Sequence, residues 1–109
     1  KARASMKICA KEVFGPVVPV TTYSDVNEAL RIANDSDLGL QAAIYTSDIG
    51  TARRAVRTLD FGGVVVKDVP TFRADQQPYG GLRDSGNTRE GPAFSVREMT
   101  AIRMVTLGA

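Results

Sequence analysis

The segment LQAAIYTSDIGTARRAVRTLDFGGVVV, residues 40–66, decides the fold. Residues 40–46 form a short apolar run that predicts a buried strand. Ser47 and Asp48 are residue types that begin helices, and an apolar stripe follows them on one helix face. Residues 61–63 then turn the chain into Val64–Val66, a β-branched run that predicts a strand covered on both faces. The helix stripe consists of Ile49, Ala52, Val56 and Leu59, and the opposite, solvated face carries Arg53, Arg54 and Arg57.

Upstream of this segment the chain predicts another strand and helix. Residues 13–20 are apolar but include Pro16 and Pro19, which favours a strand end or an edge strand. A helix is predicted over residues 25–33, because Asp25 can cap it, Glu28 lies three residues later as in a capping box, and an apolar stripe follows. The basic residues 1–11 are expected to be an exposed lead-in.

Downstream of the segment the pattern becomes irregular. Residues 68–87 lack periodicity and predict a long loop, which in compact domains is usually functional. Thr88 can cap a last helix, and residues 101–107 alternate loosely as a final strand. The predicted order is β-α-β-α-β-loop-α-β, an α/β fold with a parallel sheet and right-handed crossovers. We expect no linker that divides the chain into domains.

The composition excludes several classes of protein. The chain has 109 residues, of which 43% are apolar and 24% charged, and its net charge is +2. That charge argues against nucleic-acid or membrane binding, and no apolar run is long enough for a membrane helix. The chain has no histidine and one cysteine, Cys9, so we expect no metal site and no internal disulfide. The lone cysteine predicts a reducing, cytoplasmic compartment, and the start at Lys1 without Met predicts a piece of a longer protein or a processed product.

Glu12 and Phe14 are the first candidate binding residues. A carboxylate accepts hydrogen bonds from a vicinal diol, and an aromatic face packs on a flat heterocycle. The alternative interpretation is a surface Glu followed by a core Phe. On the long loop, Arg73 could hold a carboxylate or phosphate. Its alternative is a solvated side chain, or one that pairs with Asp68 or Asp75.

Other polar features have plainer interpretations. The glycines between Gly80 and Gly91 match neither a dinucleotide fingerprint nor a P-loop, so turn geometry is favoured over phosphate binding. A thiolate nucleophile needs an activating base, and without any histidine Cys9 is expected to be a packed thiol. Tyr79 lies on the same loop as Arg73.

Six short motifs, in this order and spacing between about residues 6 and 107, resemble a single family. They are Glu12-Val13-Phe14-Gly15-Pro16-Val17, Ala29-Leu30-x-x-Ala33-Asn34, Gly39-Leu40, Gly62-Gly63-Val64-x-Val66, Pro78-Tyr79-Gly80-Gly81 and Ser85-Gly86-x-x-Arg89-Glu90. Together they resemble the C-terminal part of the NAD(P)-dependent aldehyde dehydrogenase superfamily. The loop over residues 68–73 looks most like members that act on small polar aldehydes, such as lactaldehyde, phosphonoacetaldehyde or glyceraldehyde 3-phosphate.

The resemblance implies an oxidoreductase that converts an aldehyde to a carboxylic acid with NAD or NADP through a cysteine thioester. It implies that Glu12 hydrogen-bonds the nicotinamide ribose and that Phe14 packs against the nicotinamide end of the cofactor. Tyr79, where the family usually has Phe, would line the substrate tunnel, and Arg73 would bind an anionic substrate tail. The family's nucleophilic cysteine, general-base glutamate and cofactor domain lie upstream of these residues. We therefore expect no catalytic residue in this segment and no activity of the segment alone.

The resemblance also implies a division of roles along the chain. Residues 1–100 would form the C-terminal part of the catalytic domain, and residues 101–109 a terminal strand that joins a partner subunit in a homo-oligomer. Lys67 and Thr88 depart from the family's usual Asn and Gly. Two other hypotheses stay open: an inert, truncated α/β fragment that only folds and self-associates, and an α/β domain without a site.

Overall fold

The computed structural model describes residues 2–3 and 5–108. The chain divides into two compact units, residues 1–36 and residues 37–109. The sequence predicted no such division, because the boundary falls in a short polar turn after a helix and not in a recognisable linker. Helices and strands are both present, and the expected α/β class is confirmed.

The first unit contains a single helical turn, α1 (Lys7–Ala10), and the amphipathic helix α2 (Val26–Asn34), which buries Leu30. The prediction for α2 is confirmed. Asp25 Oδ1 accepts a hydrogen bond of 3.0 Å from the Glu28 N–H. The Glu28 carboxylate accepts two bonds in return, of 2.7 and 2.6 Å, from the backbone N–H and the hydroxyl of Ser24. These bonds satisfy N–H groups that a helix start otherwise leaves unpaired.

The strand predicted over residues 13–20 is wrong. This segment is irregular and exposed in the structure. Pro16 and Pro19 have no N–H to donate, and because they are three residues apart they would interrupt the hydrogen bonds on both edges of a strand. The apolar side chains of Val18 and Val20 remain 82% and 80% exposed, so apolar composition alone did not produce a strand.

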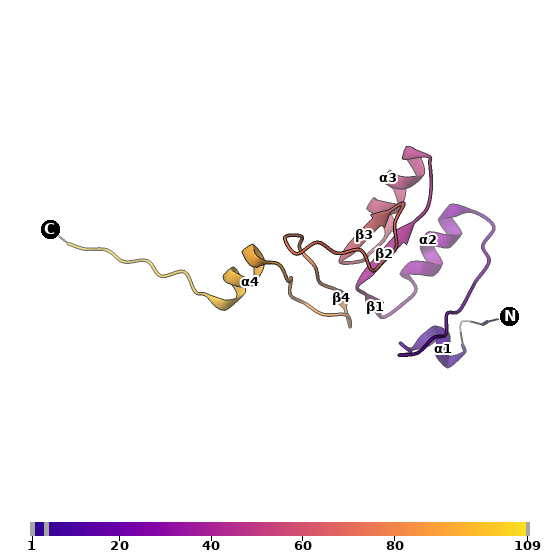
Figure 1. Ribbon diagram of the computed structural model, residues 1–109, viewed down its shortest axis with the longest axis horizontal. Coiled ribbons are helices and arrows are strands. Elements are labelled where there is room, and N and C mark those ends of the chain that lie inside the picture. The colour runs from indigo at the N-terminus through magenta and orange to yellow at the C-terminus, as the bar shows by residue number, and fades with distance from the viewer. Residues whose placement is uncertain (1, 4, 109) are drawn as a thin grey trace. The chain divides into compact units, whose positions relative to one another are not determined.

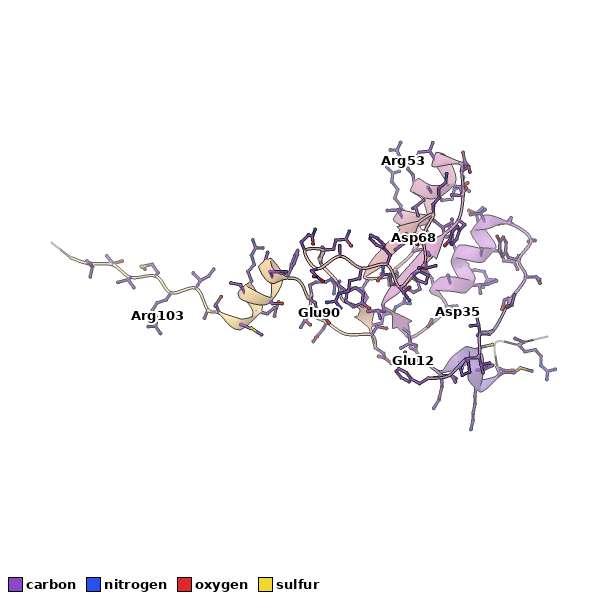
Figure 2. The ribbon with its side chains drawn as sticks, in the orientation of Figure 1. Glu12, Asp35, Arg53, Asp68, Glu90 and Arg103 are labelled. Atoms are coloured by element: carbon purple, nitrogen blue, oxygen red, sulfur yellow. The ribbon has the colours of Figure 1, made fainter. Side chains whose placement is uncertain are left out.

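The second unit contains the predicted βαβ element. Strand β2 (Gln41–Ile44) pairs in parallel with β3 (Gly63–Val66), and Gln41 lies opposite Gly63. Helix α3 (Ile49–Thr58) connects them and lies against β3 (Figure 1). Its outer face points Arg53 away from the strands (Figure 2). The parallel pairing confirms the central prediction from residues 40–66.

The packing of this element differs from the prediction in two respects. Helix α3 buries Ala52 and Ala55, whereas Ile49 and Val56, which were predicted to face inward, are exposed. The small alanine side chains let the helix backbone approach the strands closely. Strand β3 is only half-buried and Val66 is exposed, so the prediction of a strand covered on both faces is wrong for this chain.

The loop over residues 68–87 contains a strand that the sequence did not reveal. Strand β4 (Leu82–Arg83) pairs antiparallel with β1 (Leu38–Gly39), and two residues are too few to show a periodic pattern. The last helix, α4 (Pro92–Met99), begins after Gly91 and not at the predicted Thr88, because Gly91 adopts a φ of 115° that suits glycine. Residues 101–108 form neither helix nor strand within this chain.

We expect the start of α3 to give the protein a pH-dependent stability. Asp48 Oδ2 accepts a hydrogen bond of 2.6 Å from the Thr51 N–H. Hydrogen bonds from the side chain and the backbone of Thr51 lower the pKa of Asp48 below its ordinary value of 3.8. A lowered pKa in the folded state means that the stabilisation is present above the unfolded value and is lost as the pH falls through the folded value.

Asp48→Ala should therefore lower the melting temperature by a few degrees at neutral pH. The difference from the wild type should shrink as the pH falls below about 4. Thermal unfolding between pH 7 and pH 3 measures both effects, with the exposed Asp75→Ala as the matched control. A difference that stays constant over this range would contradict the role of the ionised cap.

Candidate functional site

Glu12 and Phe14 lie in the first unit, on the irregular segment that follows α1. Both side chains are exposed, and Phe14 retains 95% of its accessible surface. A hydrogen bond of 2.8 Å from the Val17 N–H to the Gly15 carbonyl tightens the turn beside them. The alternative interpretation of Phe14 as a core residue is wrong. An exposed carboxylate and an exposed aromatic ring separated by one residue are free to contact a ligand.

Arg73 and Tyr79 lie in the second unit and the structure brings them together. The Arg73 guanidinium lies 4.7 Å from the centre of the Tyr79 ring, a distance typical of a cation–π contact. Arg73 Nη2 also donates a hydrogen bond of 2.7 Å to Glu90 Oε2. The sequence placed Asp68 or Asp75 as the partner of a paired Arg73, and the structure identifies Glu90 instead. We refer to Arg73, Tyr79 and Glu90 as the Arg73 cluster.

A backbone bridge explains how Glu90 reaches residues so far back in the sequence. Tyr79 and Glu90 exchange both backbone hydrogen bonds, at 3.2 and 2.6 Å, in an isolated antiparallel bridge. On the other side, Gln41 Nε2 donates a 2.9 Å bond to the Phe72 carbonyl and ties the loop to β2. Sequence reasoning missed Glu90 as a partner, although Glu90 belongs to one of the quoted motifs. Nothing in local sequence spacing signals a bridge between single residues.

A cavity of about 470 Å³ lies beside the Arg73 cluster. Strand β3 and the turn before it form one part of its wall, and the loop that carries Phe72 and Tyr79 forms the other. Its volume is that of a small-molecule site, and its wall is largely apolar with a few polar groups. The lining residues are Gln41, residues 62–66, Phe72 and residues 77–80.

The glycines of the motifs shape this wall by close backbone approach. A Cβ on Gly62 would overlap the Gly80 carbonyl oxygen, and a Cβ on Gly80 would overlap the Thr88 carbonyl oxygen. Arg89 Nη1 fastens the same region by donating 2.9 Å bonds to the carbonyls of Gly81 and Thr88. The interpretation of these glycines as turn residues was therefore incomplete. Gly62 and Gly80 also allow the backbones of neighbouring segments to approach closely.

The two departures from the family pattern behave differently. Lys67 has a φ of 64°, in the left-handed region where Asn and Gly are favoured, so the lysine is held there at a cost of about 1 kcal/mol. Among the described residues, the non-glycine positions with positive φ are Lys67 and Arg83, so Thr88 does not need a glycine conformation.

The remaining candidates are quickly assigned. Cys9 is a free thiol on α1 and is exposed, so the prediction of a packed thiol is wrong. Among the residues that the structure describes, no group of His, Cys, Asp or Glu side chains could hold a metal ion. Within the same part of the chain, no helix is long and apolar enough to cross a membrane. The cavity and the exposed segment over residues 12–14 are candidate binding sites.

Comparison with known proteins gives a consistent result. The aldehyde dehydrogenase family model matches residues 1–105. A 3-sulfolactaldehyde dehydrogenase of Priestia aryabhattai is 44% identical over 102 residues, which are 94% of this chain and 21% of that protein. This chain thus spans about a fifth of the length of the relative that it matches.

Solved structures agree with the sequence match. The structure of aldehyde dehydrogenase 21 from Physcomitrella patens, in complex with the reaction product succinate, is 41% identical with a TM-score of 0.86 and covers 89% of this chain and 20% of its own. A betaine aldehyde dehydrogenase of Staphylococcus aureus in complex with NAD+ is 39% identical with a TM-score of 0.83, and the match covers 89% of this chain and 19% of that one.

Proposed function

Because this chain belongs to the aldehyde dehydrogenase family, we propose that it works as part of an NAD(P)-dependent enzyme that oxidises an aldehyde to a carboxylic acid. Residues 1–100 would be the C-terminal part of the catalytic domain. The observation that carries the proposal is the 470 Å³ cavity walled by the motif glycines, with the Arg73 cluster beside it. The cysteine nucleophile of the reaction would come from outside these residues.

Glu12 and Phe14 suit a nicotinamide cofactor, either NAD or NADP. An ionised carboxylate has two acceptor oxygens, which match the two hydroxyls of a ribose. Phe14 is 95% exposed and offers an unobstructed face to a flat ring. When bound, the nicotinamide would accept the hydride that the aldehyde loses. The S. aureus neighbour, which contains NAD+, supports this assignment.

Arg73 and Tyr79 suit a small aldehyde with a polar or anionic tail. A guanidinium binds carboxylate, sulfonate or phosphate groups with directional hydrogen bonds. Tyr79 lines the cavity, and Arg73 lies over its ring, so an aldehyde in the cavity would direct its tail toward Arg73. The sulfonate in the name of the Priestia relative and the succinate in the Physcomitrella structure support an anionic tail.

The C-terminal residues suit a homo-oligomer. Ile102, Val105 and Leu107 are exposed and would be covered if residues 101–109 joined a partner subunit's sheet. The chain exposes 8991 Å², whereas a folded monomer of 11.7 kDa exposes about 5,900 Å². This excess of exposed area favours association with further protein surface.

A free thiol at Cys9 fits a cytoplasmic, reducing compartment. The second candidate function is an inert fragment that only folds and self-associates through the same surface.

An aldehyde panel tests the proposal. We expect the whole protein to reduce NAD+ or NADP+ when it is given 4-oxobutanoate, and Arg73→Gln to lower kcat/KM for this anion by about tenfold to a hundredfold. The same variant should leave kcat/KM for pentanal, a neutral aldehyde of similar length, within about threefold. An equal loss with both aldehydes would contradict anion recognition by Arg73. A protein without oxidation of any aldehyde would support the inert fragment.

A further inference from the structure

The proposed function assigns no role to the Glu90 carboxylate, although this carboxylate accepts a 2.7 Å hydrogen bond from Arg73. We infer that Glu90 occupies the place on Arg73 that an anionic substrate tail takes on binding, and so limits the preference of the site for anionic over neutral aldehydes. The inference rests on the proposed role of Arg73 as the residue that meets the substrate tail.

The hydrogen bond between Arg73 and Glu90 has a geometry that allows another anion to replace the Glu90 carboxylate. Arg73 Nη2 donates one bond of 2.7 Å to Glu90 Oε2, and within residues 2–3 and 5–108 the guanidinium makes no second hydrogen bond. A guanidinium has five N–H donors and can grip a carboxylate with two of them, so this pair uses a small part of its capacity. The side chains are 46% and 58% exposed, and exposed ion pairs are weak.

The supports of Arg73 and Glu90 do not depend on the contact between their side chains. The backbone of Glu90 is held by its bridge to Tyr79, with bonds of 3.2 and 2.6 Å. The Arg73 guanidinium is supported by the Tyr79 ring at 4.7 Å. A tail anion can therefore displace the Glu90 carboxylate while both backbones and the cation–π contact stay in place.

The charge of Glu90 then has opposite consequences for two kinds of substrate. An anionic tail meets the like charge of Glu90 and must displace it or share the guanidinium with it, which weakens binding. A neutral tail does not compete for Arg73, so the ion pair between Arg73 and Glu90 stays intact when a neutral aldehyde binds. Glu90 thereby reduces the difference in kcat/KM between anionic and neutral aldehydes.

Glu90→Gln tests the inference in two independent measurements on the whole protein. In the first, inorganic sulfate is titrated as an anion probe by calorimetry, without turnover. We expect Glu90→Gln to bind sulfate about threefold to tenfold more tightly than the wild type, and the double variant with Arg73→Gln to lose this gain. Glu98→Gln, which neutralises an exposed carboxylate on α4, is the matched control and should have no effect.

In the second measurement, Glu90→Gln should raise the ratio of kcat/KM for 4-oxobutanoate over pentanal by a similar factor, through a lower KM for 4-oxobutanoate. Glu90→Asp retains the charge and should keep the ratio within about twofold of the wild type. An unchanged or lower ratio would overturn the inference, as would an equal loss of kcat with both aldehydes. If no aldehyde is oxidised, the proposed function fails, and the sulfate titration alone decides the inference.

Discussion

Gly62→Ala is expected to destabilise the protein by about 3 kcal/mol or more. The added Cβ would overlap the Gly80 carbonyl oxygen and would lie 3.0 Å from the Leu40 carbonyl oxygen. Both obstacles are backbone atoms, so no side chain can rotate to make room. Because a folded protein has a net stability of about 5–15 kcal/mol, a loss of this size changes the folded fraction measurably. Denaturant unfolding of the whole protein gives the difference.

A matched control separates this packing effect from the intrinsic preference of alanine. Gly15 has no atom within 4 Å of an added Cβ and lies outside the positive-φ region. Gly15→Ala should change the stability by less than about 0.5 kcal/mol. Equal effects of the two substitutions would show that close approach to Gly80 is not what fixes glycine at position 62. Since Gly62 and Gly80 both line the cavity, Gly62→Ala should also reduce aldehyde oxidation.

The success of the fold prediction depended on local signals. Helix α3 was found because Asp48 caps it and an apolar stripe follows, and strand β3 because three β-branched residues follow Gly63. The fold prediction failed where contacts between residues distant in sequence determine the secondary structure. Strand β4 is two residues long, and its antiparallel partner is more than forty residues back in the chain, as the register between Gly39 and Leu82 requires. No window of local sequence contains that information.

The candidate site shows the same limit. The long loop drew attention to Arg73 and Tyr79 as candidate residues, but the partner carboxylate of Arg73 was sought within five residues of it. Glu90 is 17 residues away and arrives through the bridge to Tyr79. Charge pairs close in sequence are natural expectations, because a long loop offers no frame for placing distant ones. The exposure of Phe14 was equally hidden, since an aromatic residue in an apolar run is more often buried than free.

Glu12→Ala is expected to raise the dissociation constant for NAD+ or NADP+ by about tenfold to a hundredfold. The reason is the loss of a carboxylate that would accept hydrogen bonds from two ribose hydroxyls, each a charge-assisted bond. Glu12 is exposed in the structure, so its removal leaves no buried group unpaired and should leave the unfolding free energy within about 0.5 kcal/mol of the wild type. Calorimetric titration of the cofactor measures the first quantity, and denaturant unfolding the second.

Cofactor affinity and unfolding free energy, measured together, distinguish a binding role of Glu12 from a structural one. Weaker cofactor binding at unchanged stability assigns the carboxylate to the ligand, whereas a parallel loss of both would assign it to folding. Glu98→Ala removes an exposed carboxylate from α4 and should change neither quantity. Phe14→Leu keeps an apolar side chain but removes the flat ring. It should raise the dissociation constant of the cofactor by about threefold to tenfold, a smaller factor than for Glu12→Ala. Unchanged cofactor affinity in both variants would exclude the segment over residues 12–14 from the cofactor site.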